Sequence, residues 1–234
     1  MKMAQLGPLR ARITGGTDRD GGGEGPVVVL LHGFGAPGDD LVPLWRVLDV
    51  PAETRFVFPE APLELDYGGR AWWLIDFERL ERAMRGLDPS DRTVEVPEGL
   101  VEARAAVMGL VDEIERTMKP PSLVLGGFSQ GAMLSLDVAL HRAATPAGVI
   151  QMSGTLIARD EWTPLLPARR GMRVLQSHGR EDPLLPFAIA ERLRDLLVAG
   201  GVSVEFIPFR GGHQIPENVL EAASAFIRDV TRAG

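Results

Sequence analysis

The 234-residue chain contains no cysteine, and this absence removes several kinds of chemistry at once. It excludes disulfide bonds, thiolate nucleophiles and zinc sites built on cysteine. Any covalent catalysis must therefore use another side chain. The absence of cysteine does not by itself identify the cellular compartment.

Acidic residues outnumber basic ones, and positive charge is not concentrated anywhere in the chain. Lys2 and Lys119 are the only lysines, no basic run is present, and the formal net charge is -7 at pH 7. This balance argues against binding to nucleic acid or to an anionic membrane surface. Small molecules are therefore the favoured partners.

Long apolar stretches are missing as well. The longest ones are far shorter than the roughly 20 residues that a membrane-spanning helix needs, so we expect no stable membrane insertion. Residues 1–12 lack the apolar region of a secretory signal, and we expect a cytoplasmic protein. With 45% hydrophobic residues, the chain can bury one substantial core, and it shows neither an internal repeat nor an interdomain linker.

Strand and helix patterns alternate along most of the chain. Apolar runs predict strands at 26–31, 54–58, 122–125, 148–152, 172–176 and 202–209, with an edge strand at 9–14. Helical patterns follow at 39–48, 97–118, 133–140, 187–198 and from 216 onward. Such alternation predicts an α/β fold with a mostly parallel central sheet flanked by helices.

The segment from residue 60 to residue 97 interrupts this alternation. It contains Trp72, Trp73 and Phe77, a short helical pattern near 77–84, and a polar turn at 88–91. Long irregular segments in compact domains are usually lids, binding loops or disorder. We interpret residues 60–97 as a lid or substrate-binding segment.

A serine stands between one expected strand and the helix that follows it, in the sequence Gly-Gly-Phe-Ser-Gln-Gly at residues 126–131. Gly127 and Gly131 flank Ser129 at the spacing of a nucleophile elbow, a strained turn in which the glycines let strand and helix pass closely. The alternative is a glycine-rich turn with an ordinary solvated serine. The flanking strand and helix favour the elbow.

A serine hydroxyl is a weak nucleophile without a base, so the four histidines are candidates for that role. His213 follows the last expected strand directly, at the strand ends where open α/β sheets carry their sites, and it is the predicted base. His32 and His178 each precede a glycine at a strand end and are interpreted as bracing turns by hydrogen bonds. His141, near the end of a helix, is expected to be solvated.

The base in turn needs a carboxylate that orients it and stabilises the imidazolium. Asp182 follows the strand that precedes the strand of His213. The resulting chain order of Ser129, Asp182 and His213 is the order that α/β-hydrolases use. Glu181 is the neighbouring alternative, and adjacency alone does not exclude it.

Acyl transfer also requires hydrogen-bond donors for the oxyanion. The backbone N–H of Gln130, directly after the serine, is the predicted first donor, and the loop after the first buried strand supplies the second. Within that loop, at residues 32–35, we choose the N–H of Phe34. The alternative for the loop is a simple turn.

Four stretches, taken together, resemble the phospholipase/carboxylesterase family of small α/β-hydrolases, which includes acyl-protein thioesterases. They are residues 31–35, 127–133, 178–186 and 212–216, and they span most of the chain in order. The resemblance implies one α/β-hydrolase domain over residues 1–234, without a large cap domain. It also implies serine hydrolase action on carboxylic esters or thioesters without a metal or a cofactor. Residues 77–95 match nothing in the family.

Residues 70–73, Arg-Ala-Trp-Trp, resemble the aromatic segment that this family places beside its acyl pocket. Trp72, Trp73, Leu156 and Ile157 are therefore candidates for the wall that binds the acyl chain, since apolar pockets suit such substrates. Each of the four is equally compatible with a place in the core or under a lid.

Three functions compete on this basis. A serine carboxylesterase that acts on short- to medium-chain acyl esters leads, and an acyl-thioesterase or lysophospholipase would use the same residues. A non-catalytic binding protein with this fold is disfavoured because the set of Ser129, Asp182 and His213 is intact. The oligomeric state is open, a homodimer being one alternative.

Overall fold

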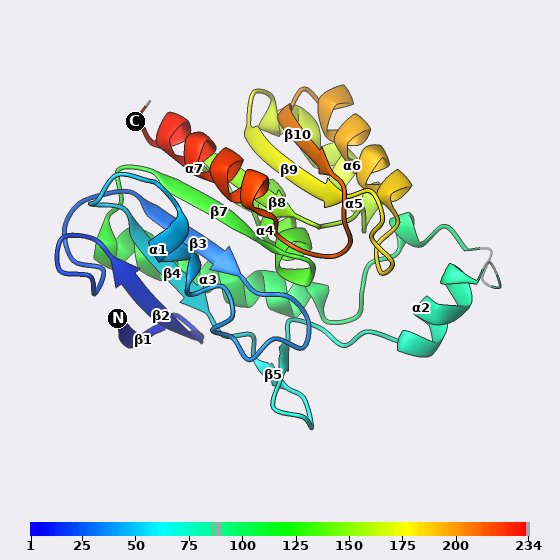
Figure 1. Ribbon diagram of the computed structural model, residues 1–234, viewed down its shortest axis with the longest axis horizontal. Coiled ribbons are helices and arrows are strands. Elements are labelled where there is room, and N and C mark those ends of the chain that lie inside the picture. Colours follow the sequence, from blue (N-terminus) through cyan, green and yellow to red (C-terminus); the bar gives the residue numbers. More distant parts are fainter. Residues whose placement is uncertain (86, 88–89, 233–234) are drawn as a thin grey trace.

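The computed structural model describes residues 1–85, 87 and 90–232, and a central sheet dominates it. The strands of this sheet are β1 Lys2–Leu6, β2 Leu9–Gly15, β3 Val27–Leu31, β4 Arg55–Pro59, β7 Leu123–Phe128, β8 Gly148–Met152, β9 Arg173–Gly179 and β10 Ser203–Phe209. They lie side by side in the order β1-β2-β4-β3-β7-β8-β9-β10 (Figure 1). Only the pairings of β2 with β1 and with β4 are antiparallel. The predicted mostly parallel sheet is thus confirmed.

Helices cover both faces of the sheet. The apolar sides of α3 Leu100–Met118, α4 Gln130–His141 and α6 Phe187–Ala199 pack on one face. Those of α1 Leu44–Val47 and α7 Glu217–Arg232 pack on the other, so that the sheet lies between two helical layers (Figure 1). Short elements, α5 Arg159–Trp162 and the 3-10 helix η2 Thr163–Arg169, connect β8 to β9. No helix in the described part of the chain is long and apolar enough to cross a membrane.

Two expectations at the amino-terminal end are wrong in detail. Residues 9–14 are not at the edge, because β1 folds back on β2 through a turn at Gly7, whose φ of 55° suits glycine. The helix expected at 39–48 is reduced to α1, a single turn that begins after Pro43. Residues 40–43 form turns instead, and a proline there withholds one backbone donor from a longer helix.

The segment 60–97 has two parts. Its first part forms a small hairpin of β5 Leu63–Glu64 and β6 Arg70–Ala71 and then enters the core at Trp72 and Trp73. Its second part carries α2 Phe77–Met84 away from the body of the molecule and returns through the 3-10 helix η1 Arg92–Val94 (Figure 1). The turn expected at 88–91 includes residues 88–89, which lie outside the described residues.

Candidate active site

Ser129 lies at the junction of β7 and α4, in a backbone conformation that residues other than glycine rarely adopt. Its φ is 55° and its ψ is -118°, and its N–H donates to the carbonyl of Met152 on β8 over 2.9 Å. A positive φ in a residue other than glycine costs on the order of 1–3 kcal/mol and persists where surrounding structure enforces it, often at functional sites. This is the strained strand-to-helix turn that the glycine spacing predicts.

The two flanking glycines are required by close backbone packing. A Cβ added to Gly127 would lie 2.5 Å from the carbonyl oxygen of Leu31, and one added to Gly131 would lie 2.1 Å from the same atom. Real Cβ atoms do not approach backbone oxygen so closely, so neither position accepts a side chain without backbone movement. The elbow therefore sits directly against the end of β3.

We expect Gly131→Ala to lower the free energy of unfolding by about 3 kcal/mol, because the added methyl group forces strand β3 away from α4. Gly212→Ala is the matched control, since the nearest atom to its added Cβ would be 3.6 Å away. Urea unfolding of both variants measures the difference. Equal stability of the two variants would contradict the packing argument.

The predicted base and its carboxylate are hydrogen-bonded to each other. Nδ1 of His213, in the loop after β10, lies 2.7 Å from Oδ2 of Asp182, in the loop after β9. Glu181, the alternative carboxylate, is exposed and faces Arg210 at 3.6 Å instead. The ring of His213 also lies against Phe128, the residue before Ser129, with 4.7 Å between ring centroids. The fold thus brings the three sequence-predicted residues to one edge of the sheet.

The carboxylate of Asp182 is held on both oxygens. Its Oδ1 accepts hydrogen bonds from the backbone N–H groups of Leu184 and Leu185, at 2.9 and 3.0 Å. Burial raises the pKa of this carboxyl, but the hydrogen bonds from His213 and from the two amides outweigh it, and the pKa lies below its usual range. Asp182 is therefore ionised at neutral pH. Because an ionised carboxylate can only accept a hydrogen bond, Nδ1 of His213 carries the proton and donates the hydrogen bond to Oδ2.

The other histidines have structural partners. His178, fully buried on β9, hydrogen-bonds through Nε2 to the carbonyl of Leu185 at 2.8 Å and so braces the turn that presents Asp182, as expected. His32 bonds through Nδ1 to the carbonyl of Gly33, and its Nε2 accepts from the N–H of Ala61. Burial lowers the pKa of His32, which agrees with a neutral ring that donates once and accepts once. His141 was expected to be solvated, but its side chain is only 21% exposed and it bonds to the carbonyl of Asp137.

The loop after β3 comes close to the serine. A Cβ added to Gly33 would lie 3.4 Å from Cβ of Ser129, so the backbone of residues 33–35 passes beside the nucleophile. Phe34, in this loop, packs edge-on against Phe77 of α2, with 5.3 Å between ring centroids. The part of the chain that matched nothing in the family thus contacts the proposed oxyanion loop, a contact that sequence reasoning missed.

The four candidates for the acyl wall belong to one buried cluster. Trp72 and Trp73 are 2% and 4% exposed, and Leu156 and Ile157 are 3% and 9% exposed. The indole N–H of Trp72 donates to the carbonyl of His32 over 2.9 Å. Each therefore has the place in the core that the sequence left open as the alternative. Whether they also contact substrate stays a prediction.

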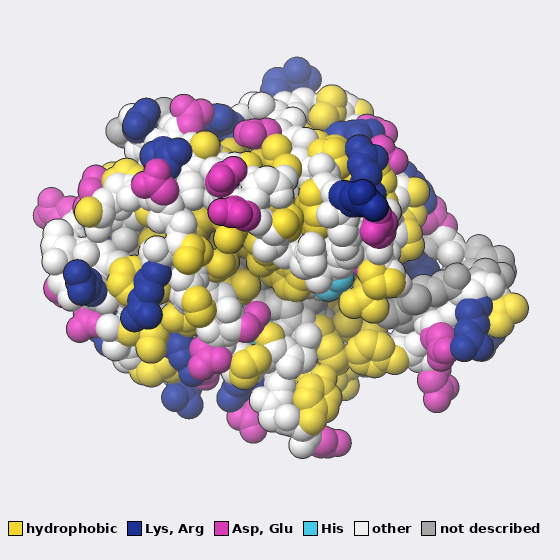
Figure 2. Space-filling view, viewed as in Figure 1, with side chains coloured by type: hydrophobic (Ala, Val, Ile, Leu, Met, Phe, Trp, Pro, Cys, Tyr) yellow, Lys and Arg dark blue, Asp and Glu magenta, His cyan; other side chains and the backbone are white. Residues whose placement is uncertain are grey.

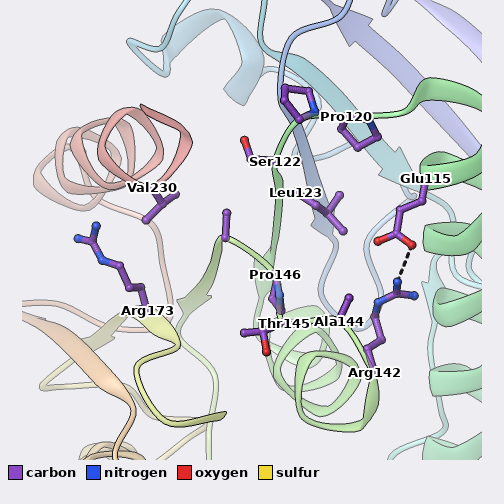
Figure 3. A pocket seen from close by; sticks show the side chains of 12 residues that line it. Glu115, Pro120, Ser122, Leu123, Arg142, Ala144, Thr145, Pro146, Arg173 and Val230 are labelled. Atoms are coloured by element: carbon purple, nitrogen blue, oxygen red, sulfur yellow. Dashed lines mark hydrogen bonds and ion pairs between the residues drawn. The ribbon is translucent and has the colours of Figure 1, made fainter. Parts of the chain in front are cut away.

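A hollow of the described surface lies away from these residues. A cavity of about 430 Å³ opens at the amino ends of β7, β8 and β9, among Pro120, Ser122, Arg142, Pro146 and Arg173 (Figure 3). Arg142 there is already paired with Glu115 at 2.8 Å, as the dashed line in Figure 3 marks. The candidate catalytic residues follow the carboxyl ends of the strands, so this cavity is at the opposite edge of the sheet.

On the face seen in Figure 2, a histidine is visible between hydrophobic side chains.

Known proteins resemble this chain over most of its length. Acyl-protein thioesterase 1 of Gibberella zeae is 28% identical over 212 residues, covering 86% of this chain and 88% of the relative. A probable carboxylesterase of Oryza sativa subsp. japonica is 28% identical over 216 residues, covering 88% of this chain and 78% of the relative. The solved structure of esterase PE8 superposes with a TM-score of 0.77 at 27% identity, covering 98% of this chain and 100% of that one.

A family model described as Phospholipase/Carboxylesterase matches residues 19–231. That match includes the elbow, both loops that carry the base and its carboxylate, and the whole aromatic segment. The resemblance drawn from the motifs and the α/β-hydrolase fold are both confirmed. This chain belongs to the phospholipase/carboxylesterase family of α/β-hydrolases.

Proposed function

We propose that this protein is a serine hydrolase that cleaves carboxylic esters of short- to medium-chain acyl groups through an acyl-enzyme on Ser129. The observation that carries the proposal is the 2.7 Å hydrogen bond between His213 and Asp182 beside a serine held at positive φ. Family membership supports the same reaction class, since the relatives are named as acyl-protein thioesterases and carboxylesterases.

In the first step, Oγ of Ser129 attacks the ester carbonyl while His213 removes its proton. Because Nδ1 of His213 donates to ionised Asp182, the lone pair on Nε2 is the one available to take that proton. The resulting imidazolium is stabilised by Asp182 and then protonates the leaving alcohol. Water attacks the acyl-enzyme in the second step, with His213 again as base.

The negative charge that develops on the carbonyl oxygen needs fixed donors. We assign these to the backbone N–H groups of Phe34, in the loop after β3, and of Gln130, the first residue of α4. Trp72, Trp73, Leu156 and Ile157 are the proposed wall for the acyl chain. Residues 60–97 act as the substrate-binding segment of a single domain.

An acyl-thioesterase is the second candidate, and the names of the fungal relatives favour it. Its catalytic residues would be identical, and only the leaving group and the acyl length would differ. A cytoplasmic location and a homodimer stay predictions from the sequence alone.

The test is a chain-length series of p-nitrophenyl esters run beside the matching acyl-thioesters, together with a fluorophosphonate probe. We expect the highest kcat/KM for a short- or medium-chain ester, and a covalent adduct on Ser129 by mass spectrometry. A strong preference for the thioesters would favour the second candidate. An adduct on a different serine, or none, would contradict both.

A further inference from the structure

We propose that the side chain of Gln130 is a positioning residue for the oxyanion hole, because it joins the aromatic segment 70–73 to the nucleophile elbow. This inference rests on the proposed function, since it concerns the geometry of the two donors assigned there. The backbone N–H of Gln130 is one of those donors. Its side chain has a separate role, which is to position residues 70–73.

The carboxamide of Gln130 is buried, and both its oxygen and its nitrogen are hydrogen-bonded. The residue is 1% exposed; its Oε1 accepts from the backbone N–H of Trp72 at 2.9 Å, and its Nε2 donates to the carbonyl of Trp73 at 2.8 Å. One carboxamide thus satisfies two backbone groups of a segment 57 or more positions away in the chain. A buried backbone group left without a partner is costly, so this contact strongly favours one placement of the segment.

The same segment is also bonded to the loop that carries Phe34. The N–H of Gly35 donates to the carbonyl of Arg70 and the N–H of Arg70 donates to the carbonyl of Ala36, both at 2.8 Å. The indole of Trp72 adds the bond to the carbonyl of His32. Residues 70–73 are therefore hydrogen-bonded to the oxyanion loop on one side and to Gln130 on the other.

This arrangement links two donors that lie on different elements. Phe34 follows β3, and Gln130 begins α4, so a change in the spacing between loop and helix would move one donor relative to the other. An oxyanion hole works because its donors are fixed before charge develops. The Gln130 side chain, through residues 70–73, holds the loop and the elbow at one separation.

The experiment compares Gln130→Met with Gln176→Met. Gln176 is a buried glutamine on β9 that donates one hydrogen bond, to the carbonyl of Ala190 at 2.8 Å, and it has no contact with residues 70–73 or with the elbow among the described hydrogen bonds. We expect kcat on a short p-nitrophenyl ester to fall about 10- to 100-fold in Gln130→Met, with KM changed less than about threefold, because the lost interaction acts on the transition state. Gln176→Met should keep kcat within about twofold.

A second variant keeps the test informative if Gln130→Met does not fold. Gln130→Glu retains the acceptor for the N–H of Trp72, and burial raises the pKa of the new carboxyl. When protonated, that carboxyl can donate to the carbonyl of Trp73. The kcat of Gln130→Glu relative to the unsubstituted protein should therefore rise as the pH is lowered from about 8 to about 6.

Fluorophosphonate labelling separates this inference from the proposed function. Adduct formation on Ser129 should occur in all variants but be slower in Gln130→Met, since the probe passes through a similar anionic transition state. Unchanged kcat in Gln130→Met, equal losses in Gln130→Met and Gln176→Met, or a pH-independent ratio for Gln130→Glu would overturn the positioning role. Failure of the unsubstituted protein to label at Ser129 would instead overturn the proposed function.

Discussion

Ser129→Ala is expected to lower kcat for ester hydrolysis by about 10⁴-fold or more, because no other group can form the acyl-enzyme. The folded state should persist, since alanine removes only Oγ and the strained backbone is enforced by the packing of Gly127 and Gly131 against β3. Covalent labelling by a fluorophosphonate should disappear in the same variant. Steady-state kinetics and mass spectrometry of the labelled protein measure both effects.

Ser153 offers a matched control for this experiment. It is a second serine at positive φ, 51°, it is buried, and its Oγ makes one long hydrogen bond to the carbonyl of Gln214 at 3.4 Å. Ser153→Ala should keep both labelling and turnover within about tenfold of normal. Near-normal turnover in Ser129→Ala, or transfer of the label to Ser153, would exclude Ser129 as the nucleophile.

Asp182→Asn should lower kcat by a comparable factor of about 10⁴, although it changes almost no volume. The carbonyl of the asparagine can keep the hydrogen bonds from Leu184 and Leu185, which leaves its amide N–H₂ facing Nδ1 of His213. His213 would then accept at Nδ1 and carry its proton on Nε2, the atom that must take the proton of Ser129. The base is present but in the wrong tautomer.

Glu181→Gln is the control for Asp182→Asn. It neutralises the adjacent carboxylate, which is exposed and faces Arg210, and it should leave kcat within about twofold of normal. Measuring kcat for both variants on the same ester also resolves the choice between the two acidic residues. If Glu181→Gln is the variant that loses activity, the assignment of the orienting carboxylate is wrong.

Local patterns were sufficient to predict most of the elements. The buried strands are visible as continuous apolar runs, because strands covered on both faces have no polar side to alternate with. The missed elements have a physical reason of the same kind. Strand β1 is exposed at the edge of the sheet, and α5 and η2 are short, so none of the three produces a periodic pattern long enough to detect.

Some features of the candidate site could likewise be predicted from local sequence, and others could not. Ser129 and its glycines could be located from spacing alone, because the steric demand of the elbow is local. The sequence favoured Asp182 but did not exclude Glu181, since two adjacent residues point in different directions and only the position of His213 distinguishes them. The side-chain role of Gln130 was equally invisible, because its partners lie 57 and 58 positions earlier in the chain.

By itself, then, the sequence determined the family, the type of sheet, and the residues whose chemistry can perform acyl transfer. Those properties depend on residue type and on short spacings, which the chain carries locally. Only the tertiary structure decided which carboxylate meets the base, how the aromatic segment is joined to the elbow, and that Phe77 of α2 packs on the loop of Phe34. These contacts join residues far apart in the chain, so they come into existence only when the sheet brings its strand ends together.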